Sequence, residues 1–255
     1  IDWPCTVKHL YQEKNLGCRF GPVAAMDWFF ENEECGIVLE DDCLPKEDFF
    51  TFCTEMLERY NNDDRIFAIC GRNPLGKAEV NSSYLFSRTF KEWGWASWRR
   101  AWKHNKVDVA TFDKAVEENI FERLYEDKVM AKYLYDTNKI VHYDQHVAWD
   151  YVWQFNIFSQ HGLVVVPAVN LVENIGLNTG THFGVDDKIV RSVFVVDSYS
   201  LPLPLKHPNF VFADYKFDRE CFYRLHPYLI PKEYTLVQRI EDSLIYRVKK
   251  LFGLA

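Results

Sequence analysis

The sequence lacks several features that mark common classes of protein. Its 255 residues contain no apolar run of the roughly 18–20 residues that a membrane-spanning helix needs. The N-terminus shows no basic region followed by an apolar one, and no internal repeat or low-complexity segment is present. We therefore expect a folded, non-repetitive protein that neither spans a membrane nor carries a visible export signal.

Positive charge is also scarce. The chain has 30 lysines and arginines against 37 aspartates and glutamates, which gives a formal net charge of −7. A protein that binds nucleic acid needs a concentrated basic surface to displace counterions from the phosphates. Nucleic acid is therefore excluded as a partner, and we expect any phosphate group to be bound through a metal ion.

Paired cysteines are missing, whereas aromatic residues are abundant. The seven cysteines form an odd set without a C-x-x-C pair or a zinc-ligand spacing, so we expect reduced, mostly buried thiols of a cytosolic protein. Aromatic residues make up 16% of the chain. Such side chains usually dominate cores, so a large aromatic core is expected, with a minority as platforms for sugars.

Short apolar runs alternate with helical patterns, which predicts an α/β layer fold. The run at residues 37–39 has the character of a strand buried on both faces of a parallel sheet. Further strands are expected at residues 66–70, 83–86 and 163–167, and helices at 23–30, 45–60, 112–136 and 146–155. Around Gly94 we expect a glycine turn that opens a helix reaching Trp102.

Three acids, Glu40, Asp41 and Asp42, directly follow the first of these strands. Open α/β sheets place their ligand crevice at the C-terminal ends of strands. Adjacent carboxylates repel one another unless a cation neutralises them, and their hard oxygens suit Mg²⁺ or Mn²⁺, which also bridges two phosphates. The sequence therefore predicts a divalent-cation site here.

A fourth acid, Asp150, lies among aromatic and apolar residues in the segment 146–155. Groups that cannot hydrate a carboxylate raise its pKa and make it a better base. The alternative interpretation is a buried acid that pairs with Arg99 or Arg100 and holds its helix in place.

Residues 37–42, followed by Phe49 and Phe50, resemble the metal motif of glycosyltransferases with a GT-A fold. They are most similar to the N-acetylglucosaminyltransferase I family with its E-D-D signature. Further pieces recur in the same order over roughly residues 5–185, and several bacterial glycosyltransferase-like proteins, some labelled haemolytic, look similar over this span. These pieces are the strand end at 71–73, the turn at 93–95, the helix at 149–150 and the loop at 174–184.

The resemblance implies a metal-dependent inverting glycosyltransferase that uses Mn²⁺ or Mg²⁺. The donor would be a nucleotide-diphosphate sugar, most consistent with a UDP-sugar, and the acceptor a hydroxyl of a glycan or other molecule. The fold implied is a Rossmann-like mixed sheet flanked by helices. The implied roles are metal ligand for Asp42, donor contacts for Glu40, Asp41, Asn73, Trp95 and His182, and general base for Asp150, with a register uncertainty of one residue toward Tyr151.

The family pattern also predicts the domain organisation. Residues 1–185 would form the GT-A-like catalytic domain without its first strand, because family members have an additional strand and helix before the equivalent of Asp2. Residues 186–255 would form a helical extension. Its last segment, 240–255, is expected either to pack on its own domain or to rest as a basic amphipathic helix on the inner face of the membrane.

Two other classes of function fit parts of the sequence. A non-catalytic carbohydrate- or cation-binding protein would explain the aromatic residues and the acids without a role for Asp150. A metal-dependent hydrolase usually shows a two-metal or histidine-rich constellation, and the eight histidines are scattered here. Turnover of a nucleotide-sugar in the presence of Mn²⁺ would separate the first alternative from a transferase.

Overall fold

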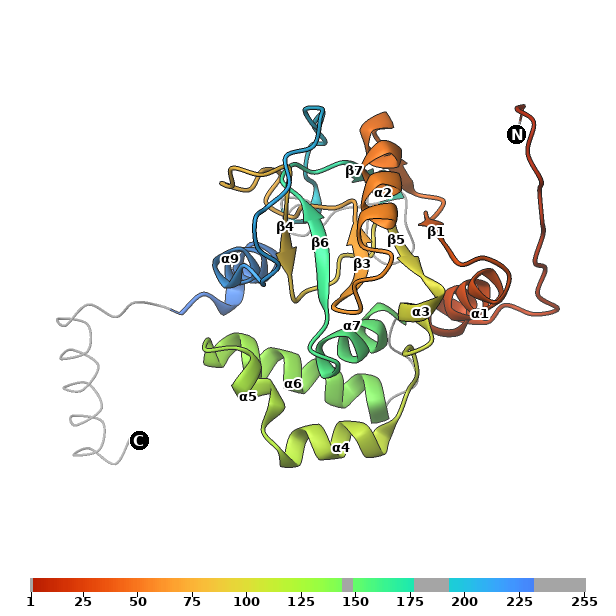
Figure 1. Cartoon of the computed structure of the whole chain (residues 1–255). Helices are drawn as coiled ribbons and strands as arrows, with labels where there is room; N and C mark the ends of the chain where they lie inside the picture. Colours follow the sequence, from red (N-terminus) through yellow and green to blue (C-terminus); the bar gives the residue numbers. More distant parts are fainter. Residues whose placement is uncertain (1, 144–148, 177–192, 232–255) are drawn as a thin grey trace, which may run out of the picture. The chain divides into compact units, whose positions relative to one another are not determined.

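The computed structural model describes residues 2–143, 149–176 and 193–231 (Figure 1). The chain divides into a compact unit of residues 1–225 and a second unit that begins at residue 226. The described part of the second unit holds the short 3-10 helix η2 (Pro227–Leu229). The fold that follows is that of the first unit.

A five-stranded mixed sheet forms the centre of this unit. The two strands β3 and β6 are parallel, and the pairs β1–β5, β5–β3 and β6–β4 are antiparallel. Two further strands, β2 (Cys43–Pro45) and β7 (Val172–Asn174), pair as a separate antiparallel ribbon. In spatial order the sheet consists of β1 (Cys35–Val38), β5 (Trp95–Trp98), β3 (Ile66–Cys70), β6 (Leu163–Pro167) and β4 (Tyr84–Ser87).

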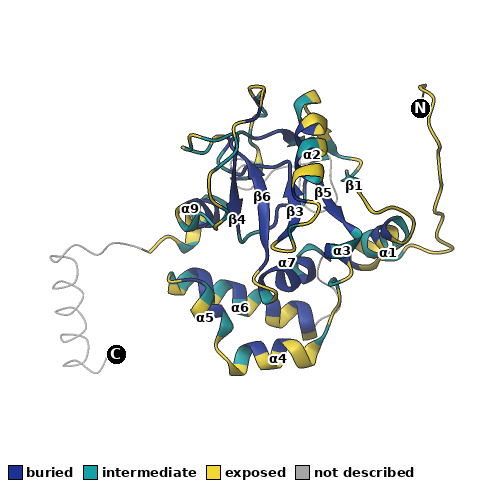
Figure 2. Ribbon diagram, viewed as in Figure 1, coloured by how far each residue is buried: buried dark blue, intermediate teal, exposed yellow. Residues whose placement is uncertain are grey.

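Helices cover both faces of the sheet, so the predicted α/β class with a mixed sheet is confirmed. Successive residues of a strand point to opposite faces. In β4, for example, Tyr84 and Phe86 join the core under one helix, α2 (Glu47–Arg59), whereas Leu85 joins the core of the other face. That second face is covered by α1 (Gly17–Asn32), α3 (Arg99–Trp102), α7 (Trp149–Ser159) and α9 (Tyr215–Leu225). The central strands are buried along their length (Figure 2).

Three more helices form a layer against α7. They are α4 (Val109–Glu117), α5 (Ile120–Leu124) and α6 (Lys128–Tyr143), where a single helix over residues 112–136 was expected. The Asp108 side chain caps the start of α4 by accepting hydrogen bonds from the backbone N–H groups of Ala110 and Thr111. Asn119 adopts a left-handed conformation between α4 and α5. These local stops, which periodicity does not reveal, divide the expected helix.

Two expectations about the strands were wrong. The strand expected at residues 37–39 is β1, which lies at the edge of the sheet, runs antiparallel to its neighbour and is only half-buried. The glycine turn at Gly94 exists, with φ of +66°, but it opens the fully buried strand β5 before the short helix α3 begins. The tryptophans at its two ends alternate between faces, which suits a strand between two neighbours.

Other expectations concern the cysteines, the membrane and the domain boundary. All seven cysteines are free thiols, but only Cys53, Cys70 and Cys221 are buried, so the expectation that most are buried was wrong. None of the described helices is both long and apolar enough to cross a bilayer. The boundary predicted at residue 185 falls outside the described residues, and the first compact unit continues through α9.

Asp218 fixes α9 to the end of β4. Its carboxylate is 1% exposed and accepts hydrogen bonds from the Ser87 hydroxyl (2.5 Å), the Arg88 backbone N–H (3.1 Å) and the Thr89 hydroxyl (3.1 Å). Burial raises the pKa of Asp218. Without the carboxylate, the Arg88 N–H would lose this acceptor, and the two hydroxyls would keep only each other and the Thr89 carbonyl.

We expect Asp218→Ala to lower the free energy of unfolding by about 2–4 kcal/mol, because buried donors that lose their acceptor retain their desolvation cost. Denaturant unfolding measures the change. Glu220→Ala is the matched control, since Glu220 is an exposed acid on the same helix whose one ion pair within the described residues is with Lys216 at 3.6 Å. Equal stability of the two variants would contradict the role of Asp218.

Candidate functional site

The acidic turn of residues 40–42 joins β1 to the β2–β7 ribbon. Its backbone is fixed at both ends: the Cys43 N–H donates to the Glu40 carbonyl (3.1 Å), and the Ile175 N–H donates to the Asp42 carbonyl (2.9 Å). The second bond continues the register of β2 and β7 by one residue. The turn is therefore held by backbone contacts that do not occupy its carboxylates.

Two of its acids lie close enough to share a cation. One ligand atom each from Glu40, Asp42 and Cys43 lies within 4.8 Å of the others, whereas Asp41 is exposed. The Cys43 thiol approaches Oδ1 of Asp42 at 3.8 Å, and burial raises the pKa of Cys43 to about 12. A neutral thiol is a weak ligand, so carboxylate oxygens dominate the set, which fits a hard cation such as Mg²⁺ or Mn²⁺.

The surroundings of Glu40 disfavour the charged form of its carboxyl group. Burial raises its pKa to about 7, and the negative charges of Glu92 and Asp42 add to the shift. A hydrogen bond from the Trp149 side chain partly opposes it. Because Trp149 is the first residue of α7, this bond links the acidic turn to that helix.

Asp150, the second residue of α7, belongs to the same group of acids. Burial raises its pKa to about 8, followed by the negative charges of Glu92 and Glu40, while backbone N–H groups at the start of the helix act in the opposite direction. The residue as a whole is half-buried, and its carboxyl group is enclosed, which agrees with burial as the main cause of the shift in its pKa. The structure thus brings Asp150 and Glu40, which are far apart in sequence, into one electrostatic environment.

Sequence analysis missed Glu92 as a member of this site. Its carboxylate lies 3.7 Å from the guanidinium of Arg72, which is 2% exposed and stacks on the Trp93 ring at 3.7 Å from the ring centre. The Gly71 N–H donates to the Gly94 carbonyl (2.7 Å), so the end of β3 and the turn before β5 meet. An acid directly before a Trp-Gly turn was the available signal.

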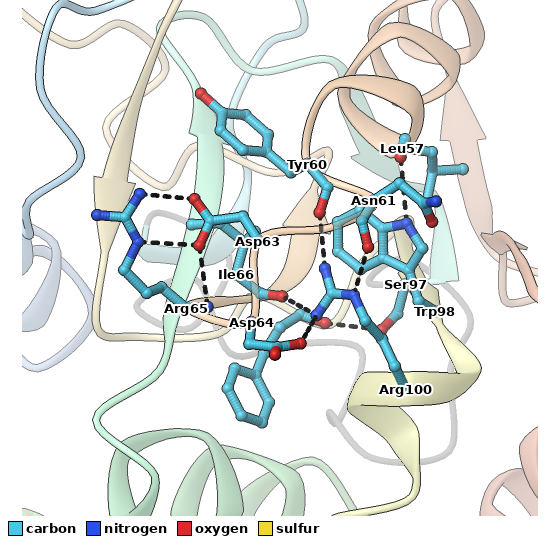
Figure 3. A network of polar contacts seen from close by, with 11 residues as sticks. Leu57, Tyr60, Asn61, Asp63, Asp64, Arg65, Ile66, Ser97, Trp98 and Arg100 are labelled. Carbon is cyan, nitrogen blue, oxygen red and sulfur yellow. Dashed lines mark hydrogen bonds and ion pairs between the residues drawn. The ribbon is translucent and has the colours of Figure 1, made fainter.

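The alternative role for Asp150, as a partner of Arg99 or Arg100, has no support. Arg100 donates to the carbonyls of Tyr60 (2.7 Å), Asn61 (2.8 Å) and Ile66 (2.9 Å), as Figure 3 shows. Arg99 donates to the Phe30 carbonyl and pairs with Glu34 at 2.5 Å. Within the described part of the chain, no ion pair involves Asp150.

The remaining predicted donor contacts lie elsewhere or outside the described residues. Asn73 is fully buried, and its amide nitrogen donates to the carbonyls of Pro167 (2.9 Å) and Ala168 (3.2 Å). Trp95 is 1% exposed and stacks on Trp149 with ring centres 5.7 Å apart. Both geometries indicate structural roles, and a donor contact for either residue stays a prediction. His182 lies outside the described residues.

The metal assignment predicts that Asp42 and its neighbour Gly176 control affinity for Mn²⁺. A Cβ added at Gly176 would lie 2.3 Å from Oδ2 of Asp42, so the carboxylate would have to move. We expect both Asp42→Asn and Gly176→Ala to weaken Mn²⁺ binding at least about tenfold, measured by electron paramagnetic resonance of free Mn²⁺. Asp64→Asn removes one exposed charge elsewhere and should bind as the wild type does. Unchanged affinity in Asp42→Asn would refute the site.

The raised pKa values of Glu40 and Asp150 predict how stability depends on pH without metal. Between the unfolded values near 4 and the folded values of about 7 and about 8, the native state binds more protons than the unfolded state. Their contribution to stability is therefore complete below about pH 4 and is lost as the pH rises through 7 to 8.

Denaturant unfolding at a series of pH values, in the presence of a chelator, measures this slope. In Asp150→Asn the decline between pH 5 and pH 8 should be smaller than in the wild type, because the amide does not titrate. An identical slope in the two proteins would show that Asp150 titrates normally.

Compared with models of protein families and with curated proteins, the chain gives no match.

Proposed function

We propose that this chain is a metal-dependent inverting glycosyltransferase that moves a sugar from a nucleotide-diphosphate donor to a hydroxyl acceptor. The observation that carries the proposal is the convergence of the Glu40–Asp42 turn and Asp150 in one electrostatic environment. The GT-A resemblance implies these same residues in the roles of metal site and base. A UDP-sugar is the donor that the resemblance favours.

The metal end of the site would receive the donor's diphosphate. Asp42 and Glu40 would hold Mn²⁺ or Mg²⁺ through their carboxylate oxygens, and Asp41, which is exposed beside them, would contact the donor's ribose. A bound divalent cation would supply charge stabilisation to the departing diphosphate. The half-buried setting strengthens such interactions, because the effective dielectric is lower than in water.

Asp150 would act at the acceptor end. A sugar hydroxyl is a poor nucleophile near neutral pH, so it must lose its proton as it attacks the anomeric carbon. A carboxylate with a pKa of about 8 is a stronger base than a free aspartate, and its deprotonated fraction rises through pH 8.

The non-catalytic alternative predicts binding of sugar or cation without turnover. Cytoplasmic location stays a prediction. Contact of residues 240–255 with a membrane surface also stays a prediction, since these residues lie outside the described part of the chain. Neither affects the proposed chemistry.

The test is a panel of nucleotide-sugars, each incubated with the protein and glycan acceptors, with and without Mn²⁺, while release of the nucleotide is measured. We expect metal-dependent release with at least one donor. Asp150→Asn should lower turnover about 10²–10⁴-fold, the usual contribution of a general base, while Mn²⁺ and donor binding persist.

Asp64→Asn serves as the control, since that carboxylate is exposed and remote from the acidic turn. Donor and Mn²⁺ binding without turnover across the whole panel would favour the non-catalytic alternative. Full turnover in Asp150→Asn would exclude Asp150 as the base, and Tyr151 would be the next residue to substitute.

A further inference from the structure

A cavity lies where the start of β6, the end of β4 and two helices meet. Its volume is about 270 Å³. Arg88 follows β4, Arg123 belongs to α5, and His161 lies in the turn between α7 and β6. The other lining residues are Ile120, Leu124, Phe158 and Ser159.

This cavity is remote from the acidic turn. The strands β1, β3 and β6 run in the same direction, because β1 and β3 are both antiparallel to β5 and β3 is parallel to β6. Glu40 and Arg72 follow the C-terminal ends of β1 and β3, whereas the cavity lies at the N-terminal end of β6. The two sites therefore lie at opposite ends of the strands.

The lining of the cavity is cationic in a chain whose net charge is −7. Its lining residues include two arginines and a histidine, and they include no aspartate or glutamate. Glu122, the neighbour of Arg123 in α5, lines a different cavity. Across the described ranges, neither Arg88 nor Arg123 makes an ion pair with a carboxylate.

The geometry also fixes one of the arginines. Arg88 is half-buried, and one of its terminal nitrogens donates to the Leu124 carbonyl at the end of α5. A guanidinium has five N–H donors, so this single bond orients the group and leaves other donors for a ligand. Phe158, which is 3% exposed, supplies an apolar wall beside it, and low polarity strengthens a charge interaction.

We propose that this cavity, defined by Arg88, Arg123 and His161, binds a small tetrahedral oxyanion of the phosphate class. Paired guanidinium groups match the oxygens of such an anion through charge-assisted hydrogen bonds. The volume of about 270 Å³ corresponds to about nine water molecules at roughly 30 Å³ each, and it lies below the range of about 300–1,000 Å³ that is usual for larger organic ligands. The inference is independent of the proposed transferase activity.

Isothermal titration calorimetry with sodium phosphate, at ionic strength held constant with sodium chloride, tests the proposal. The wild type should show saturable binding of one phosphate per chain. Arg123→Gln should weaken it about tenfold or more, because one charge-assisted hydrogen bond is lost. Lys139→Gln, which removes an exposed positive charge from α6 outside the cavity, should bind phosphate as the wild type does.

Arg88→Gln should also lose binding, but it removes the contact with Leu124 and could unfold the local structure. Arg123→Gln avoids this difficulty, since its exposed side chain makes no described hydrogen bond, and circular dichroism verifies the fold of each variant. Absence of saturable binding in the wild type would overturn the proposal. Equal affinity of the wild type and Arg123→Gln would overturn it as well, because phosphate would then bind elsewhere.

Discussion

Burial of the carboxyl groups of Glu40 and Asp150, together with repulsion among Glu40, Glu92 and Asp150, determines the charge state of the candidate site. The three acids come from the turn after β1, the loop before β5 and the first turn of α7. Each position is imposed by the sheet and its covering helix, so the acids cannot separate without loss of core contacts. Protonation or a cation must therefore relieve the repulsion, and this requirement links the charge state of the site to metal binding.

Arg72 limits this repulsion without abolishing it. Its guanidinium is buried, so burial lowers its pKa, while Glu92 at 3.7 Å acts in the opposite direction. Stacking on Trp93 holds the guanidinium at the end of β3. Among the described residues, the ion pair of Arg72 with Glu92 is the only one that involves an acid of the site. A fully neutralised group of side chains would have little affinity for a divalent ion, and the remaining negative charge is what a metal would bind.

Sequence reasoning succeeded where a feature depends on local residues and failed where it depends on distant ones. The strand at residues 66–70 and the strand at 163–167 were predicted at their observed bounds, because continuous apolar runs between polar breaks are local signals. β5 was mistaken for part of a helix, since its strand character comes from β1 and β3 on either side. Glu92 escaped notice for the same reason: only the meeting of the β3 and β5 ends shows that it faces Arg72. The pairing of β2 with β7 likewise joins residues more than 100 positions apart.

The acidic turn and the arginine-lined cavity lie at opposite ends of the strands, an arrangement that a net charge of −7 conceals. Acids gather beyond the C-terminal ends of β1 and β3, whereas arginines line the cavity at the start of β6. The acidic turn would repel a phosphate group unless a cation were present, whereas the arginine-lined cavity would attract it directly. The strands β3 and β6, in which every residue is buried, lie between these two places. The buried strands therefore keep a metal-bound phosphate at the acidic turn apart from a phosphate in the arginine-lined cavity, because the side chains of neither place can reach across the core.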